Sequence, residues 1–349
     1  MLLSFAWAGF PSADPACPRT SQEVEANTME FRNLGDSGLK VSLAGIGCNN
    51  FGWTIDAAAT EKVVRTALDA GINFFDTADI YDAGTSETYL GKALGAERQN
   101  AVICTKFGVP SGPGPLDGGA SRRYIMKACE ASLSRLGTDY IDVYILHQPD
   151  ADTPIGETLD ALNTLIDQGK VRYIGCSNFA GWQISDATWE AETAGLRGFV
   201  TAQNEWSLLE RGIEQEVVPS CEHHGLGVLP YFPLASGALT GKYKRGEKFA
   251  KDSRYGGEGG GSQLFNTMYS HFVSDENLAR VERLEKVADE AGLTIVELAL
   301  SWLGSQSSVS SVIAGATRPE QVEANAKLTR GDLGPEVFEA VEKALSAGA

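Results

Sequence analysis

The 349-residue sequence lacks any apolar run of the roughly 18 residues that a membrane-spanning helix needs. It is also short of basic residues, since 29 Lys and Arg stand against 46 Asp and Glu for a formal net charge of −17. A surface of that sign repels nucleic-acid phosphates and anionic lipid headgroups. We therefore expect neither a nucleic-acid partner nor a membrane partner, and a ligand with phosphate groups would need a local cluster of cations.

Several sequence signatures of reactive sites are missing. The six cysteines are scattered without a CxxC pair, and HxH, HxxxH and HExxH patterns are absent, so we expect no metal site. A GxSxG elbow is absent as well, which disfavours acyl transfer. Thiols without partners in the sequence are typical of a reducing compartment, which predicts a cytoplasmic protein.

The first 28 residues differ from the rest of the chain. They are poor in charge and rich in Pro, Ala and Ser, and no Lys or Arg precedes Arg19. A secretory signal would begin with a positive region and continue into a longer apolar core. We interpret residues 1–28 as a disordered extension or a misassigned start, with export as the alternative, and residues 29–349 as a single domain.

Short apolar runs alternate with amphipathic stretches from residue 41 onward. The runs are 41–46, 72–75, 102–105, 141–146, 171–176, 199–203, 228–231 and 311–315. Helical patterns occupy 57–70, 86–94, 121–136, 156–168, 277–291 and 319–328. Runs that are apolar on both faces suit a parallel sheet covered by helices, and eight βα units predict a (β/α)8 TIM barrel. The alternative is an open doubly wound sheet, which favours GxGxxG after its first strand, where this chain has GIGCNNFG.

Two long segments interrupt the alternation. Gly108–Ala120 follows the third run, and Ser236–Ser274, which contains a basic cluster, follows the seventh. Both come where a barrel places its active-site loops, and loops of this length are uncommon without a function. We expect long active-site loops there, with plain surface excursions as the alternative.

Polar residues stand at the ends of successive apolar runs. Asp76 ends the second run, with Tyr81 five residues later, Lys106 ends the third, and His147 ends the fourth. The next two runs end in Ser177, Asn178 and Gln203. The carboxyl ends of barrel strands meet at one rim. A lone Lys106 could form a Schiff base. We favour a carbonyl-reducing site instead, in which the Lys106 ammonium lowers the pKa of Tyr81, Asp76 holds that ammonium, and His147 donates to the carbonyl oxygen.

Ordered motifs between Met29 and Asn325 strengthen this interpretation. The segments FFDTADIY, CTKFG, SRLGTDYIDVYILHQPD, IGCSNF, QNEWSLL and YFPLASGALTGKY resemble the aldo-keto reductase superfamily, in particular its soluble bacterial members and the potassium-channel β subunits. The resemblance implies that Tyr81 is the general acid/base, that Lys106 and Asp76 lower its pKa, and that His147 orients the carbonyl.

The resemblance also implies NADPH/NADP+ as cofactor. Its contacts would be Ser177, Asn178 and Gln203 at the nicotinamide amide, Tyr231 on the ring, Phe232, Pro233, Leu234, Ser236, Lys242 and Arg254 near the pyrophosphate, and Gly315, Gln321 and Asn325 toward the adenosine. Ala324 departs from the Glu that related proteins commonly carry. We expect Thr317 and Glu320 to form a capping box at a helix start, with Pro319 in its first turn. That helix start and Arg318 would bind a 2′-phosphate, which favours NADPH over NADH.

The sequence is less specific about the substrate. We expect Phe51, Trp53 and Trp206 to line the pocket for a small carbonyl compound. Two alternatives remain beside general aldehyde or ketone reduction: an NADP(H)-sensing, partner-binding module with slow turnover, and a reductase of nucleotide-linked ketosugars. The substrate's identity, the oligomeric state and the direction of the reaction stay open.

Overall fold

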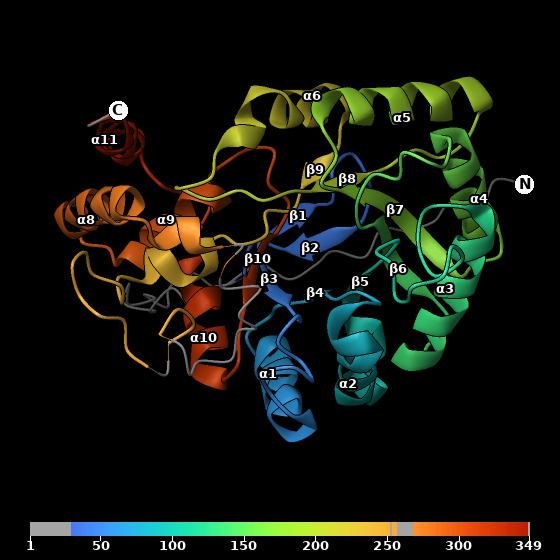
Figure 1. The fold of residues 1–349 in the computed structure, drawn as a ribbon, viewed down its shortest axis with the longest axis horizontal. Helices are drawn as coiled ribbons and strands as arrows, with labels where there is room; N and C mark the ends of the chain where they lie inside the picture. The colour runs from blue at the N-terminus through green and yellow to red at the C-terminus, as the bar shows by residue number, and fades with distance from the viewer. Residues whose placement is uncertain (1–28, 252, 257–266, 268, 348–349) are drawn as a thin grey trace, which may run out of the picture.

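The computed structural model describes residues 29–251, 253–256, 267 and 269–347. Its centre is an 8-stranded sheet with the order β10-β3-β4-β5-β6-β7-β8-β9, in which every neighbouring pair is parallel. The strands are β3 (Ala44–Gly47), β4 (Phe74–Asp76), β5 (Val102–Phe107), β6 (Ile141–Leu146), β7 (Val171–Ser177), β8 (Thr201–Gln203), β9 (Gly227–Val228) and β10 (Val312–Gly315). In Figure 1 these strands lie at the centre and the helices surround them.

The sheet curls until its two edges meet. Val228 in β9 forms a parallel bridge with Val309, just before β10. Its N–H donates to the carbonyl of Ser308 at 2.8 Å, and its carbonyl accepts from the N–H of Ser310 at 3.0 Å. These bonds join the strands into a TIM-type α/β barrel, as the alternation of apolar runs and helices predicted.

Helices follow most strands and cover the barrel. They are α1 (Ala57–Asp69), α2 (Thr85–Leu94), α3 (Arg122–Leu136), α4 (Ile155–Asp167), α5 (Gly181–Ala194), α6 (Val217–His224), α8 (Asp275–Glu290), α9 (Ile295–Gly304), α10 (Pro319–Leu328) and α11 (Pro335–Ser346). The expected helices all form, with ends within two residues of the predicted ones. The helices α5, α6, α9 and α11 were not predicted.

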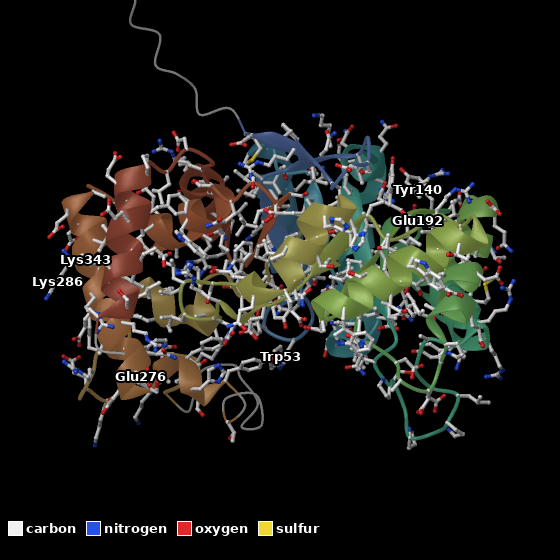
Figure 2. All side chains as sticks on the ribbon, turned by 90° about the horizontal axis from the view of Figure 1, so that it is seen from above. Trp53, Tyr140, Glu192, Glu276, Lys286 and Lys343 are labelled. Carbon is white, nitrogen blue, oxygen red and sulfur yellow. The ribbon has the colours of Figure 1, made fainter. Side chains whose placement is uncertain are left out.

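The first apolar run divides into two elements, which corrects the prediction of one strand at 41–46. Its beginning belongs to β2 (Lys40–Ser42), which pairs antiparallel with β1 (Phe31–Asn33), and only Ala44–Gly47 joins the barrel. The hairpin docks on the amino-terminal ends of the strands, where the N–H of Asp36 donates to the carbonyl of Gly225 at 2.8 Å. In Figure 2 the hairpin is at the top of the view, while Trp53 lies near the lower face.

The two long segments keep their predicted places in the chain. Residues 108–121 connect β5 to α3 without a helix or strand, and the N–H of Gly119 closes the segment by donating to the carbonyl of Gly108 at 2.8 Å. Beyond β9, the 3₁₀ turns Ala235–Thr240 and Ser270–Val273 precede α8. Part of that second segment and residues 1–28 fall outside the described residues.

Among the residues that the structure describes, no helix is both long enough and apolar enough to cross a membrane. The same residues contain no group of three His, Cys, Asp or Glu side chains that could hold a metal ion. The five described cysteines are all buried free thiols.

Candidate active site

A buried ion pair forms the centre of the site. Lys106 extends from β5 to Asp76 at the end of β4, where its Nζ lies 2.7 Å from Oδ2 of the carboxylate. The same Nζ donates to the carbonyl of Thr77 at 2.9 Å and to the hydroxyl of Tyr81 at 3.4 Å. Gln203 in β8 donates from Nε2 to the other oxygen of Asp76 at 2.8 Å. The strand-end residues predicted from separate apolar runs thus meet at one rim.

A strained turn presents Tyr81 to this ion pair. Asp82 and Ala83, the next two residues, have φ values of +47° and +53°, a region that non-glycine residues seldom adopt. Such a backbone persists only where surrounding contacts fix it. Here Ser86, at the start of α2, donates to the carbonyl of Cys48 at 2.8 Å and lies 2.8 Å from Oγ1 of Thr77. The turn therefore holds the Tyr81 hydroxyl beside Lys106.

Two opposing effects act on the pKa of Tyr81. Burial raises the pKa of Tyr81 above its ordinary value, and the nearby Lys106 ammonium lowers it by less than burial raises it. For Lys106 itself, burial alone would lower the pKa, but the Asp76 carboxylate and then Tyr81 raise it above its ordinary value. Lys106 therefore acts on Tyr81 in the predicted direction, but burial opposes it and has the larger effect on the pKa of the phenol.

His147 faces Tyr81 across the cavity. Their rings meet edge to face, with centroids 5.9 Å apart and an interplanar angle of 77°. Burial, followed by the positive charge of Lys106, lowers the pKa of His147 to about 3. The imidazole is therefore neutral at physiological pH and has one N–H to donate. Its buried Nδ1 has no hydrogen-bond partner within the described ranges.

A second hydrogen-bonded group borders His147. Asn178, in the left-handed region at φ +60°, donates from Nδ2 to the carbonyl of His147 at 2.9 Å. The hydroxyl of Tyr231 donates to Oδ1 of the same amide at 2.8 Å. An amide and a phenol ring from different strand ends are thus fixed side by side.

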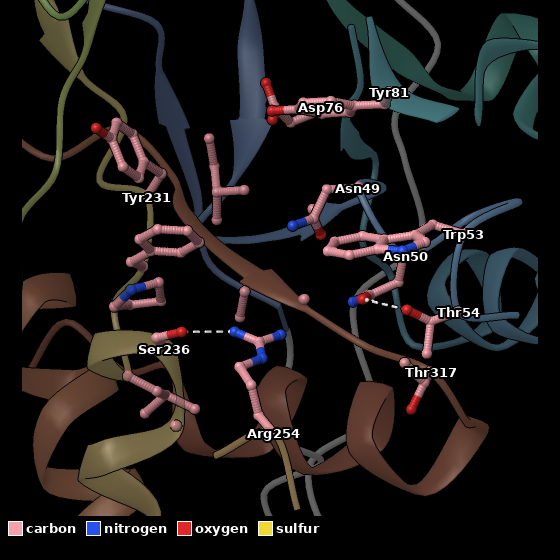
Figure 3. A pocket seen from close by; sticks show the side chains of 18 of the residues that line it. Asn49, Asn50, Trp53, Thr54, Asp76, Tyr81, Tyr231, Ser236, Arg254 and Thr317 are labelled. Atoms are coloured by element: carbon pink, nitrogen blue, oxygen red, sulfur yellow. Dashed lines mark hydrogen bonds between the residues drawn. The ribbon is translucent and has the colours of Figure 1, made fainter. Parts of the chain in front are cut away.

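These groups border a cavity of about 780 Å³. Figure 3 shows Asp76 and Tyr81 at one end and Tyr231 on the opposite wall. Toward the other end, Nη1 of Arg254 donates to Oγ of Ser236 at 2.7 Å, and Lys242, Thr317 and Arg318 also line the wall. The predicted site residues on its wall are Trp53, Asp76, Tyr81, His147, Ser177, Asn178, Gln203, Tyr231, Phe232, Pro233, Leu234, Ser236, Lys242, Arg254, Gly315, Thr317, Arg318 and Gln321.

Comparison with known proteins agrees with this geometry. The family model described as "Aldo/keto reductase family" matches residues 44–346. The chain belongs to the aldo/keto reductase family. Family membership and the oxidoreductases among its relatives support an oxidoreductase of carbonyl compounds as its general chemistry.

Three relatives illustrate the range of this family. A probable voltage-gated potassium channel subunit beta of Arabidopsis thaliana is 40% identical over 304 residues, covering 86% of this chain and 90% of the relative. The uncharacterized oxidoreductase YrpG of Bacillus subtilis is 35% identical, covering 89% of this chain and 94% of its own. The L-glyceraldehyde 3-phosphate reductase of Escherichia coli is 32% identical, covering 85% and 86%.

Four predicted residues of this aldo/keto reductase lie off the cavity wall, and one of them, Lys106, is the fully buried partner of Asp76. Phe51 is fully buried in the hydrophobic core. Trp206 is 2% exposed. Its Nε1 donates to Glu214 at 2.9 Å, and its ring packs on that of Trp302 with the centroids 5.7 Å apart. Both were expected in the substrate pocket, and both are packing residues instead. Asn325 is buried in α10 and is not among the lining residues.

The expected capping box at α10 does not form. The helix begins after Arg318 with Pro319 in its first turn, and no side chain caps it. Thr317 instead donates from its N–H and its hydroxyl to Oε1 of Gln321, at 2.8 and 3.1 Å. Glu320 points toward Arg318 instead, with 3.8 Å between carboxylate and guanidinium. Thr317 is therefore held by Gln321, the residue that follows the expected partner Glu320.

Several lining residues were missed. Asn49, Asn50 and Thr54 follow β3, and Oγ1 of Thr54 donates to Oδ1 of Asn50 at 3.2 Å. The pair of asparagines directly after the first barrel strand was a usable signal, because it stands at the same rim as the other strand ends. Tyr269 lines the wall from beyond β9, and nothing in its local sequence marks it.

Proposed function

We propose that this aldo/keto reductase reduces an aldehyde or ketone to an alcohol with NADPH, and that Tyr81 supplies the proton. The observation that carries the proposal is the placement of one ammonium, Nζ of Lys106, 2.7 Å from Asp76 and 3.4 Å from the Tyr81 hydroxyl at the inner end of the cavity. When bound, the cofactor supplies a hydride. A substrate carbonyl oxygen on which negative charge develops needs a proton donor, and this arrangement places the Tyr81 hydroxyl to supply the proton.

The residues on the wall suit a dinucleotide. The amides of Asn178 and Gln203 and the ring of Tyr231 would hold a nicotinamide, and Lys242, Arg254 and Ser236 would hold its phosphates. Gly237, between Ser236 and Lys242, has a φ of +99°, a conformation that favours glycine, so no side chain covers the cavity wall there. The concentration of cations at one end of a cavity in a chain of net charge −17 supports phosphate binding.

The chain's own residues would act in a defined order. His147, neutral in this site, donates a hydrogen bond to the substrate carbonyl oxygen and orients it toward Tyr81. As negative charge develops on that oxygen, the Tyr81 hydroxyl transfers its proton to it. The resulting phenolate is stabilised by the Lys106 ammonium, which Asp76 keeps charged and in place. The long segments after β5 and β9 are proposed as loops that border the substrate, with Trp53 at the mouth.

The start of α10 supports NADPH over NADH. Arg318 is exposed, lines the cavity and directly precedes the first residue of the helix, whose start no side chain caps. We expect Arg318→Ala to weaken NADPH binding by about 10- to 100-fold, the loss of a charge-assisted hydrogen bond to a phosphate. NADH, which lacks the 2′-phosphate, should bind the variant and the parent protein equally.

The measurement is a titration of tryptophan fluorescence with each nucleotide. Arg330→Ala is the matched control, because Arg330 lies beyond α10 and pairs with Asp332 at 2.7 Å. A loss of affinity confined to NADPH and to Arg318→Ala supports the proposal. Equal losses for both nucleotides, or tighter NADH binding by the parent protein, would contradict the preference. The buried free thiols support the cytoplasm as the compartment.

The named relatives favour a second candidate function. Proteins called probable or putative potassium-channel β subunits are 35–40% identical to this chain, so a nucleotide-sensing, partner-binding role is the alternative. Tightly retained NADP(H) with slow turnover across a broad panel of carbonyl compounds, together with a stable protein partner, would favour that alternative.

A further inference from the structure

A carboxylate without a cationic partner stands at the mouth of the cavity. Asp82 directly follows Tyr81, is exposed and lines the same cavity as Tyr81 and His147. It forms no ion pair with any residue in the described part of the chain. Because Asp82, Tyr81 and His147 line one cavity, a compound bound beside Tyr81 shares that cavity with the Asp82 carboxylate.

The backbone and a glycine fix the place of this carboxylate. Asp82 has φ +47°, in the left-handed region. Its side chain lies against Gly52, where an added Cβ would come within 2.5 Å of Oδ2 of Asp82. Gly52 precedes Trp53, so the carboxylate lies between the turn that carries Tyr81 and the loop that carries Trp53. Its position is therefore built into two elements of the rim.

Among the described residues, the rest of the mouth provides no compensating positive charge. The cations on the wall, Lys242, Arg254 and Arg318, belong to the proposed phosphate end, and the buried Lys106 is paired with Asp76. His147 is neutral because its pKa is lowered to about 3, by burial and then by Lys106.

Aromatic side chains also line the mouth, beside the uncharged Asn49, Asn50 and Thr54. Trp53, 43% exposed, together with Phe232 and Tyr269, gives it walls without formal charge. An anionic substrate would leave water there without gaining a counterion.

We propose that Asp82 is a specificity-determining residue that excludes anionic aldehydes, so that the substrates of this site are uncharged or cationic carbonyl compounds. The inference rests on the proposed reductase function. It concerns the charge of the substrate, which is independent of the proton transfer by Tyr81.

The test compares two aldehydes of the same shape. 4-Carboxybenzaldehyde is anionic, and 4-formylbenzamide is its neutral counterpart. We expect the parent protein to have the higher kcat/KM for the neutral aldehyde, and Asp82→Asn to reduce the neutral-to-anionic ratio by about three- to tenfold, the effect of one partly screened charge at close range. Asn is the appropriate replacement, because it is isosteric and tolerates the left-handed backbone. Added salt should shrink the parent ratio.

Asp139→Asn is the control, since Asp139 is exposed between α3 and β6 and also changes the net charge by one. It should leave the ratio unchanged. If the parent protein reduces both aldehydes equally well, or Asp82→Asn leaves the ratio as it was, the inference is wrong while the reductase function stands. Failure to reduce either aldehyde with NADPH would contradict the proposed function, and this inference with it.

Discussion

Lys106 is fully buried and Tyr81 partly buried at the inner end of the cavity, and this burial affects how they share a proton. A phenol withdrawn from water resists ionisation, so the pKa of Tyr81 is raised despite an ammonium 3.4 Å away. The ammonium is kept charged by Asp76, and it acts on the phenolate that forms during proton transfer. The pair thus suits a proton donor better than a resting phenolate.

This environment predicts the pH dependence of carbonyl reduction. Tyr81 must be protonated to donate, and burial raises its pKa above the ordinary value of a tyrosine, so kcat for reduction should stay level through neutral pH and fall only at strongly alkaline pH. His147 should add no change in kcat near the ordinary pKa of a histidine, because its own pKa is about 3 and the imidazole is already neutral at that pH. The check is kcat with NADPH at saturating aldehyde across this range. An alkaline limb centred near pH 7 to 8 would show that Lys106 outweighs burial.

For single residues, the sequence predicted site positions correctly where a reactive side chain stands at the end of an apolar run. Asp76, Lys106, His147 and Gln203 each follow an apolar run, and the parallel barrel brings all such ends to one rim. Trp206 was misplaced because it lies beyond the end of β8, where no strand periodicity indicates which way a side chain points, and in the structure it packs on Trp302. Neither a residue's burial nor the net pKa that follows from it can be read from residue types alone.

Among the elements, those with a strong pattern were predictable. The helices α1, α3 and α4 have one apolar and one polar face, and their predicted ends differ from the observed ones by no more than one residue. The helix α5 was missed because Trp182 and Trp189, 64% and 62% exposed, stand on its outer face and obscure its apolar stripe. The helix α9 is buried on most of its surface and so has no polar face to mark its period.

The packing of α2 on α3 yields a stability prediction. Gly91 in α2 faces the end of α3 so closely that an added Cβ would lie 2.1 Å from the carbonyl oxygen of Leu136. Alanine favours an isolated helix by about 1 kcal/mol over glycine. Here we expect Gly91→Ala to lower the free energy of unfolding by about 1 to 3 kcal/mol, because the two helices must separate.

Urea denaturation of the two variants measures this difference. Gly38→Ala is the control, because nothing lies within 4 Å of its added Cβ. This variant should have nearly the same free energy of unfolding as the parent protein. A Gly91→Ala protein as stable as the parent would mean that α2 and α3 do not approach this closely.

Across the whole molecule, opposite charges are separated along one cavity. The chain has a net charge of −17, yet Lys242, Arg254 and Arg318 gather at one end, and Asp82 stands near the other. Under the proposals above, phosphate groups would bind at the first end and uncharged carbonyl compounds would enter at the second. The sequence predicted the barrel and the basic cluster. Closure of the sheet depends on the contact between Val228 and Val309, which are 81 residues apart by number, and no local pattern predicts such a contact.

The most direct test of the account is the turnover of Tyr81→Phe, followed as NADPH oxidation with 4-nitrobenzaldehyde. The substitution removes the proton-donating hydroxyl and keeps the ring, so kcat should fall by about 10²- to 10⁴-fold, while NADPH titration of tryptophan fluorescence gives the parent affinity. A Tyr81→Phe protein that binds NADPH and retains full turnover would contradict the central claim that Tyr81 supplies the proton.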